Sequence, residues 1–305
     1  MTTARMILVA TDLSAPARHA VQRALLLASS AGSEVHIVHA LELDALDSLR
    51  ELLGANLSAT KAALEADACD RLAQLATDAA DRQGIAPQTR VVAGAPLAVI
   101  AGEADALDAG LLVLGARGES FLRHAMLGST AARLLRKSVR RTVLVVKQPP
   151  RGDYRNVLVA VDFSPASRLA IREARRWAPG AELVLLHAFE LPYEGKLTYA
   201  GVEEQVIRQY ISDGIRTRRE RLHELAASAG LASGSYLVRV IHGDPSQQII
   251  AMEQEYDADL IVVGKHGTHI TEELLLGSVT KHVLAEAQGD VLVVADTRPA
   301  EDRLP

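Results

Sequence analysis

The sequence predicts an α/β protein made of two tandem doubly wound domains, each built on a parallel sheet of five strands. Three observations predict this fold class. The chain repeats itself with an offset of about 149 residues, its apolar runs are short and rich in Val, Leu and Ile, and helix-like stretches separate those runs. Its length of 305 residues suits two domains of about 150 residues each.

Four strand-like segments occur in both halves of the chain. MILVATD (6–12) matches NVLVAVD (156–162), EVHIVHALE (34–42) matches ELVLLHAFE (182–190), GLLVLGARG (110–118) matches DLIVVGKHG (259–267), and TVLVVK (142–147) matches DVLVVA (290–295). These runs are nearly unbroken in hydrophobicity, which is typical of parallel strands covered by helices on both faces.

The repeat divides the chain into domains at residues 1–148 and 154–297. They are joined near QPPRGDYRN (148–156), whose Pro, Arg and Gly content suits an exposed linker. Right-handed crossovers between successive parallel strands then leave few topologies for each half.

Helix boundaries are predicted by capping residues in both halves. Ser14 and Ser164 each precede a proline in the first turn of a helix, so we expect their hydroxyls to act as N-caps. Glycines mark the helix ends. The first helix of each half is expected to end near Gly32 or Gly180, and the long helical regions 44–83 and 199–229 are expected to end at Gly84 and Gly230.

Composition excludes several classes of function. The net charge of −5 provides no basic surface for nucleic acid. The single cysteine excludes an internal disulfide and any site built on several cysteines. The N-terminus has no pattern of a secretion signal, and no apolar run approaches the ~18–20 residues of a membrane helix, so no membrane insertion and a cytoplasmic location are expected.

A glycine motif occurs at the same place in each half. GARGESFLRHAMLGST (115–130) and GKHGTHITEELLLGSV (264–279) share the spacing Gly-x2-Gly-x9-Gly followed by Ser. The first glycine closes an apolar run, where doubly wound sheets bind ligands, and the last opens a helix, whose free N–H groups attract anions. We expect the glycines to let the backbone bend and approach a ligand closely. The motif therefore predicts a phosphate clamp.

With VATDLS (9–14) and VAVDFS (159–164), the motif resembles the universal stress protein family. The resemblance covers almost the whole chain as two tandem domains, and the glycine set is specific to the branch of that family that binds ATP. It implies that ATP is the ligand, with Mg²⁺ able to accompany its phosphates, and that the chain acts in a stress response.

The resemblance also assigns site residues. Asp12 and Asp162 would lie beside the adenine and ribose, and the backbone at Ala40 and Ala188 would contact the base. Arg117 and Lys265 would neutralise phosphate charge. The phosphates would be lined by Gly115, Gly118, Gly128, Ser129 and Thr130 in the first half and by Gly264, Gly267, Gly277 and Ser278 in the second.

Family members pair their final strands between subunits. In a tandem chain the resemblance implies that TVLVV (142–146) and DVLVV (290–294) pair with each other, which gives a pseudo-twofold unit equivalent to a dimer. The sequence leaves open whether two such chains form a homodimer, and it identifies no protein partner.

The sequence is compatible with three hypotheses for the function. No GxSxG or HExxH motif is present, so the leading hypothesis is a regulatory module whose ATP occupancy biases a conformation or a partner interaction, with slow ATP hydrolysis at most. The second is a zinc-dependent hydrolase in the second half, because Asp162, His187, His242 and His266 all follow or end strands there. The third is an interaction protein with empty pockets.

Overall fold

The computed structural model describes residues 6–43, 56–116, 127–137, 141–191, 194–266 and 276–295. The chain divides into two compact units, Met1–Asp153 and Tyr154–Pro305. Each unit contains one run of five parallel strands covered by helices, so the predicted fold class is confirmed.

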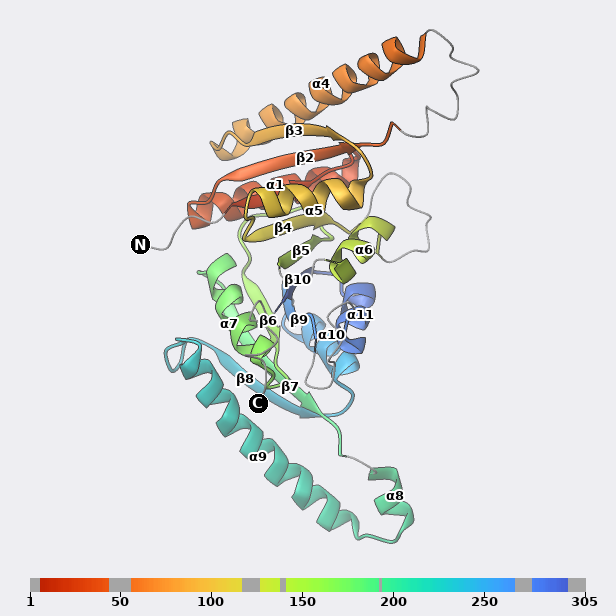
Figure 1. Cartoon of the computed structure of the whole chain (residues 1–305). Coiled ribbons are helices and arrows are strands. Elements are labelled where there is room, and N and C mark those ends of the chain that lie inside the picture. The colour runs from red at the N-terminus through yellow and green to blue at the C-terminus, as the bar shows by residue number, and fades with distance from the viewer. Residues whose placement is uncertain are drawn as a thin grey trace. The chain divides into compact units, whose positions relative to one another are not determined.

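The first unit has the strand order β3-β2-β1-β4-β5. Helices α1 and α4 pack on one face of this sheet and α5 packs on the other, as the strands they contact and Figure 1 show. The strands are β1 (Ile7–Ala10), β2 (Val35–Leu41), β3 (Gln88–Ala93), β4 (Leu111–Gly115) and β5 (Thr142–Val146), and the helices are α1 (Ala15–Ala31), α4 (Leu57–Gln83), α5 (Pro96–Ala106) and α6 (Ser129–Lys137).

The second unit repeats this arrangement with the order β8-β7-β6-β9-β10. Helices α7 and α9 pack on one face, and α10 and α11 pack on the other (Figure 1). The strands are β6 (Asn156–Ala160), β7 (Glu182–Phe189), β8 (Leu237–His242), β9 (Leu260–Gly264) and β10 (Asp290–Val294), and the helices are α7 (Pro165–Trp177), α8 (Glu194–Tyr199), α9 (Glu204–Ser228), α10 (Pro245–Glu255) and α11 (Ser278–Glu286).

Central strands form the core of each unit. In β1 the side chains of Ile7, Leu8 and Val9 are fully buried, and in β6 Leu158 and Val159 are fully buried. Burial of consecutive residues requires cover on both faces, since successive side chains of a strand point in opposite directions. The apolar runs of the sequence are unbroken because both faces of these strands are covered.

Most predicted helix ends are confirmed. Gly32, Gly84 and Gly230 have positive φ angles of 61°, 68° and 90°, which glycine adopts without a steric penalty. Two details differ. Helix α7 ends at Trp177 rather than near Gly180, because Pro179 pushes Ala178 out of the helical region. The long helix predicted over roughly 199–229 begins at Glu204, because the separate short helix α8 ends at Tyr199 and a turn follows it.

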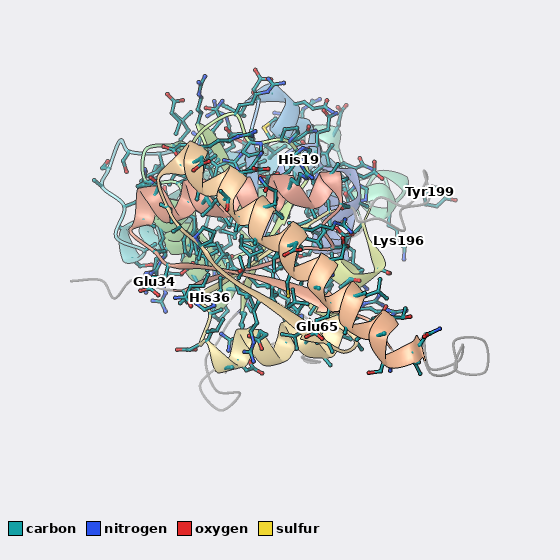
Figure 2. The ribbon with its side chains drawn as sticks, turned by 90° about the horizontal axis from the view of Figure 1, so that it is seen from above. His19, Glu34, His36, Glu65, Lys196 and Tyr199 are labelled. Atoms are coloured by element: carbon teal, nitrogen blue, oxygen red, sulfur yellow. The ribbon has the colours of Figure 1, made fainter. Side chains whose placement is uncertain are left out.

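Helix exteriors are polar, as the sequence indicates. Glu65 lies on the exposed side of α4, and Lys196 and Tyr199 project from α8 (Figure 2), where Tyr199 is 95% exposed. Across the described parts of both units, each helix is either too short or too polar to cross a membrane.

Candidate functional site

The second unit contains a cavity at the point where its strand order reverses. After β6 the chain continues to β7 and β8 on one side, and it then returns to β9 and β10 on the other side of β6. Because the crossovers leave β6 and β9 in opposite directions, their carboxyl ends enclose a crevice in which doubly wound proteins bind ligands. The cavity lies there and has a volume of about 330 Å³, within the range of small-molecule pockets.

Most of the predicted residues of the second half lie together in this cavity. Strand ends contribute Asp162, Ala188 and Gly264, and the start of α11 contributes Gly277 and Ser278. These positions are separated by more than a hundred residues in sequence, and the parallel topology brings them to one edge. The walls also include apolar groups from β6, β7, β9 and α10, namely Ala160, Val161, Leu186, Val263, Pro245 and Ile249.

Asp162 is held in one orientation by its own turn. Its Oδ1 accepts hydrogen bonds from the Ser164 N–H (2.9 Å) and from the Ser167 hydroxyl (2.7 Å). Phe163, between them, has a φ of 61°, a strained value for a bulky residue that is typical of functional turns. Among the described residues Oδ2 has no hydrogen-bond partner, so it can accept from a ligand.

The start of α11 supplies free main-chain donors. The Gly277 N–H donates to the Lys265 carbonyl at 3.0 Å, and Ser278 is the first residue of the helix. The N–H groups of the first turn have no partner within a helix, and they carry its positive dipole end. This end of the cavity therefore suits a negatively charged group.

Among the described glycines of the motif, Gly128, Gly264 and Gly277 do not use the positive φ angles that glycine allows. Gly277 has φ −57° and ψ 152°, which any residue adopts, and neither Gly128 nor Gly264 has a positive φ. A Cβ at Gly264 would lie 3.2 Å from the His266 carbonyl oxygen, so close packing explains this glycine. Gly277 lines the cavity. Conformational freedom is used instead at Gly94 and Gly243, with φ of 140° and 142°.

Among the cavity residues that the sequence reasoning missed, Pro245 and Ile249 carried a signal in the sequence and Thr280 did not. Pro245 and Ile249 open α10 on the cavity wall, and the repeated pattern AGAP (93–96) and HGDP (242–245) marks that turn in both halves. Thr280 has no such signal. Its Oγ1 donates to the Gly264 carbonyl at 2.7 Å and thereby ties α11 to the end of β9.

Lys265 is the one described residue predicted for the phosphate site of the second half that does not line the cavity. Its side chain is only 2% exposed and is not part of the cavity wall. The neighbouring predicted residues Arg117, Gly118 and Gly267 lie outside the described residues.

The first unit has the same main-chain frame at the corresponding place. Gly115 ends β4, Ser129 and Thr130 begin α6, and the Gly128 N–H donates to the Ala116 carbonyl at 2.8 Å. Asp12 accepts from the Ser14 N–H at 3.0 Å, as Asp162 does from Ser164. Ala40 lies next to the end of β2, as Ala188 does in β7.

The predicted zinc ligands do not converge. His187 contacts Phe163 with tilted rings and stacks on Phe189 beneath α9, whereas its neighbour Ala188 lines the cavity, because adjacent strand residues face opposite sides. His242 lies on the α9 side too, and its Nε2 is 3.0 Å from Glu194 Oε2. Only Asp162 and His266 reach the cavity. Within the described ranges no three His, Cys, Asp or Glu side chains could hold a metal ion, so the structure does not form the predicted zinc site.

Burial lowers the pKa of His187. The hydrogen bond to the Val161 carbonyl (2.7 Å) and the charge of Asp162 oppose this effect, while the charges of Arg218 and Arg221 reinforce it. Since a carbonyl only accepts, Nδ1 of His187 carries the hydrogen and donates it to Val161.

Two doubly wound units in one chain define a tandem α/β protein, and the second unit has a ligand-sized cavity at its strand switch with a helix start beside it. The sequence model of the universal stress protein family matches residues 3–147 and 153–295. The chain belongs to the universal stress protein family, and it carries the family domain twice.

Named relatives are consistent with this membership. A universal stress protein of Mycobacterium tuberculosis H37Rv is 29% identical over 198 residues, which cover 61% of this chain and 62% of the relative, less than two thirds of its length. Another from M. tuberculosis CDC 1551 is 27% identical over 248 residues, covering 77% of this chain and 70% of that protein.

Solved structures share the fold over almost the whole chain. A universal stress protein from Archaeoglobus fulgidus has a TM-score of 0.65 at 22% identity, covering 97% of this chain and 100% of that one. A protein of unknown function from Pseudomonas aeruginosa has a TM-score of 0.63 at 20% identity, covering 97% and 94%. At these identities the similarity concerns the fold alone.

Proposed function

We propose that this chain is a nucleotide-binding regulatory module that holds ATP at the strand switch of each unit. The observation that carries the proposal is the cavity of the second unit, in which Asp162, Ala188, Gly264, Gly277 and Ser278 lie together. The glycine motif and the resemblance to the family predict each of these residues as part of a nucleotide site.

The chemistry of the cavity suits the three parts of a nucleotide. Apolar side chains from β7 and α10, including Leu186 and Ile249, offer a surface for a base. The free Oδ2 of Asp162 can accept a hydrogen bond from a ribose hydroxyl. The start of α11 offers main-chain N–H groups for phosphate oxygens. When bound, ATP would supply charge at this helix start, and its occupancy would bias the neighbouring main chain toward one conformation.

Isothermal titration of nucleotide-free protein with ATP tests the proposal. We expect two sites per chain. The Gly277→Val variant fills the space beside the helix start without backbone strain, because its φ of −57° suits valine. It should weaken ATP binding in the second unit at least tenfold, about 1.4 kcal/mol, and a Gly128→Val, Gly277→Val double variant should weaken both sites.

Gly180→Val is the matched control. Gly180 lies in an exposed turn of the same unit, and a Cβ there would meet no atom within 4 Å. It should bind ATP as the unmodified chain does. Absence of heat with millimolar ATP, or equal affinities of the Gly277→Val and Gly180→Val variants, would contradict the proposal.

A further inference from the structure

The α9 side of the second unit carries a row of stacked rings at the ends of its strands. Phe163 and His187 have ring centroids 4.5 Å apart, and His187 and Phe189 have centroids 6.2 Å apart with nearly parallel planes. We call these three side chains the aromatic row. Phe189 is 7% exposed and His187 8%, so the row is a rigid part of the sheet surface.

Two arginines of α9 lie on the phenyl rings of this row. The guanidinium carbon of Arg218 is 4.0 Å from the Phe189 centroid, and that of Arg221 is 4.3 Å from the Phe163 centroid. The arginines are three positions apart and therefore share one face of the helix. A guanidinium stacked on a ring by its face keeps its N–H groups at the edge, where they remain available as donors.

Carboxylates do not neutralise these two arginines. On the same helix Arg208 pairs with Glu204, and Arg216 lies 2.8 Å from Asp213. Among the described residues, neither Arg218 nor Arg221 has a carboxylate within 4 Å, and Arg221 is exposed. Asp162 acts on His187 electrostatically, but its Oδ1 is engaged by Ser164 and Ser167.

Gly214 makes room for this arrangement. The Arg218 Nη1 donates to the Gly214 carbonyl at 3.3 Å. A Cβ at position 214 would lie 3.0 Å from that Nη1 and 3.4 Å from the Phe189 ring. Any larger residue would therefore displace the guanidinium or the ring, although a glycine inside a helix costs about 1 kcal/mol relative to alanine.

We propose that Arg218 and Arg221, positioned by the aromatic row, form a binding site for the phosphate group of a small molecule, separate from the cavity at the strand switch. Two adjacent guanidinium groups match the double negative charge and the several oxygens of a phosphate better than they match a single carboxylate. Bound phosphate would relieve the mutual repulsion of two cations on one helix face.

The site is specific to the second unit. The positions that correspond to Phe163 and Phe189 in the first half are Leu13 and Leu41. Neither leucine can stack on a guanidinium, so these two positions of the first unit offer no such ring support. The proposal is therefore independent of nucleotide binding, whose predicted residues occur in both halves.

Titration of the His187 ring by NMR, with and without pyrophosphate at constant ionic strength, tests the proposal. Because the charges of Arg218 and Arg221 lower the His187 pKa, a bound anion should raise it. The Arg218→Gln, Arg221→Gln double variant should abolish this rise and weaken pyrophosphate binding at least tenfold in calorimetry. Arg219→Gln, a neighbouring exposed arginine, is the matched control and should keep both properties.

Additional titrations of His187 distinguish this site from the cavity and identify the source of the phosphate. The Gly277→Val variant should retain the response of His187. Inorganic phosphate, pyrophosphate and AMP distinguish a free phosphate from a phosphomonoester, and a response to any of them supports the site. The proposal is overturned if the His187 pKa is insensitive to all three, if sodium chloride has the same effect, or if Gly277→Val abolishes the response.

Discussion

The two units share a main-chain frame but differ in the side chains attached to it. His39 Nδ1 lies 2.9 Å from the Thr11 carbonyl oxygen, and His187 Nδ1 lies 2.7 Å from that of Val161. The turn after the first strand has the same left-handed residue in each, with φ of 64° at Leu13 and 61° at Phe163. The repeated hydrogen bonds show that the frame tolerates much side-chain divergence.

The segment that precedes the final strand of each unit, called here the joint, is held by different side chains in the two units. In the second unit the buried Glu253 accepts from the N–H groups of Gln288 (2.8 Å) and Gly289 (2.7 Å) through one oxygen. In the first unit Arg141 binds the Ala109 carbonyl and the largely exposed Asp105. A buried charge with two fixed donors contributes more than an exposed ion pair, because solvent screens the latter.

The largest expected effect concerns this joint. Glu253→Ala removes the buried acceptor of two part-buried hydrogen bonds, so it should lower the free energy of unfolding of the second unit by about 3 kcal/mol. Trp177 is the single tryptophan and is buried in that unit, so its fluorescence during urea unfolding reports the change. Asp105→Ala, followed by hydrogen exchange in the first unit, should cost at most about 1 kcal/mol.

The exposed neighbour Glu255 provides the control. Glu255→Ala should change the same unfolding free energy by less than about 0.5 kcal/mol. Equal losses for Glu253→Ala and Asp105→Ala would show that burial does not distinguish the two joints.

The free energy of unfolding of the second unit should depend on pH through His187. Because burial lowers the pKa of His187 from the value of 6.5 in an unfolded chain, the unfolded state binds more protons in acid. The stability of the second unit should therefore be complete above pH 6.5 and decrease as the pH falls through the lowered pKa. Tryptophan-monitored urea unfolding from pH 7.5 to 5 measures this decrease.

His187→Asn isolates the contribution of this side chain. Asparagine can keep a donor toward the Val161 carbonyl but cannot be protonated, so the decrease should be smaller in the variant. A variant with the same pH dependence as the unmodified chain would assign the effect to other groups.

The smallest expected effect concerns the caps of the first helices. Ser14 Oγ accepts from the Ala17 N–H at 3.3 Å, whereas the buried Ser164 Oγ has no hydrogen-bond partner among the described residues. Ser14→Ala should destabilise the first unit by about 1 kcal/mol, and Ser164→Ala should be nearly neutral. Hydrogen exchange of α1 and α7 compares them, and a larger loss at α7 would contradict the assignment.

Particular residues show how far sequence reasoning reaches into the site. Gly264, Gly277 and Ser278 were predicted because they follow an apolar run or open a helix, both of which are local signals. Thr280 was not predicted, because its place on the cavity wall depends on how α11 packs against the sheet, whereas Pro245 was missed although the repeated turn pattern marks it. His187 was predicted to lie with Asp162 and His266, but it lies between Phe163 and Phe189. A sequence shows where a strand ends more clearly than it shows which side of the sheet each side chain faces.

Local and repetitive features of the chain were therefore determined by the sequence itself. Apolar runs define buried parallel strands, glycines with positive φ end helices, and the duplication sets the two units, because these properties depend on a few neighbouring residues. Only the tertiary structure decided that Asp162 and Ala188 share a cavity while His187 and His242 lie beneath α9 with Arg218. Strand alternation and helix packing act across distant segments, and one sequence does not display those contacts.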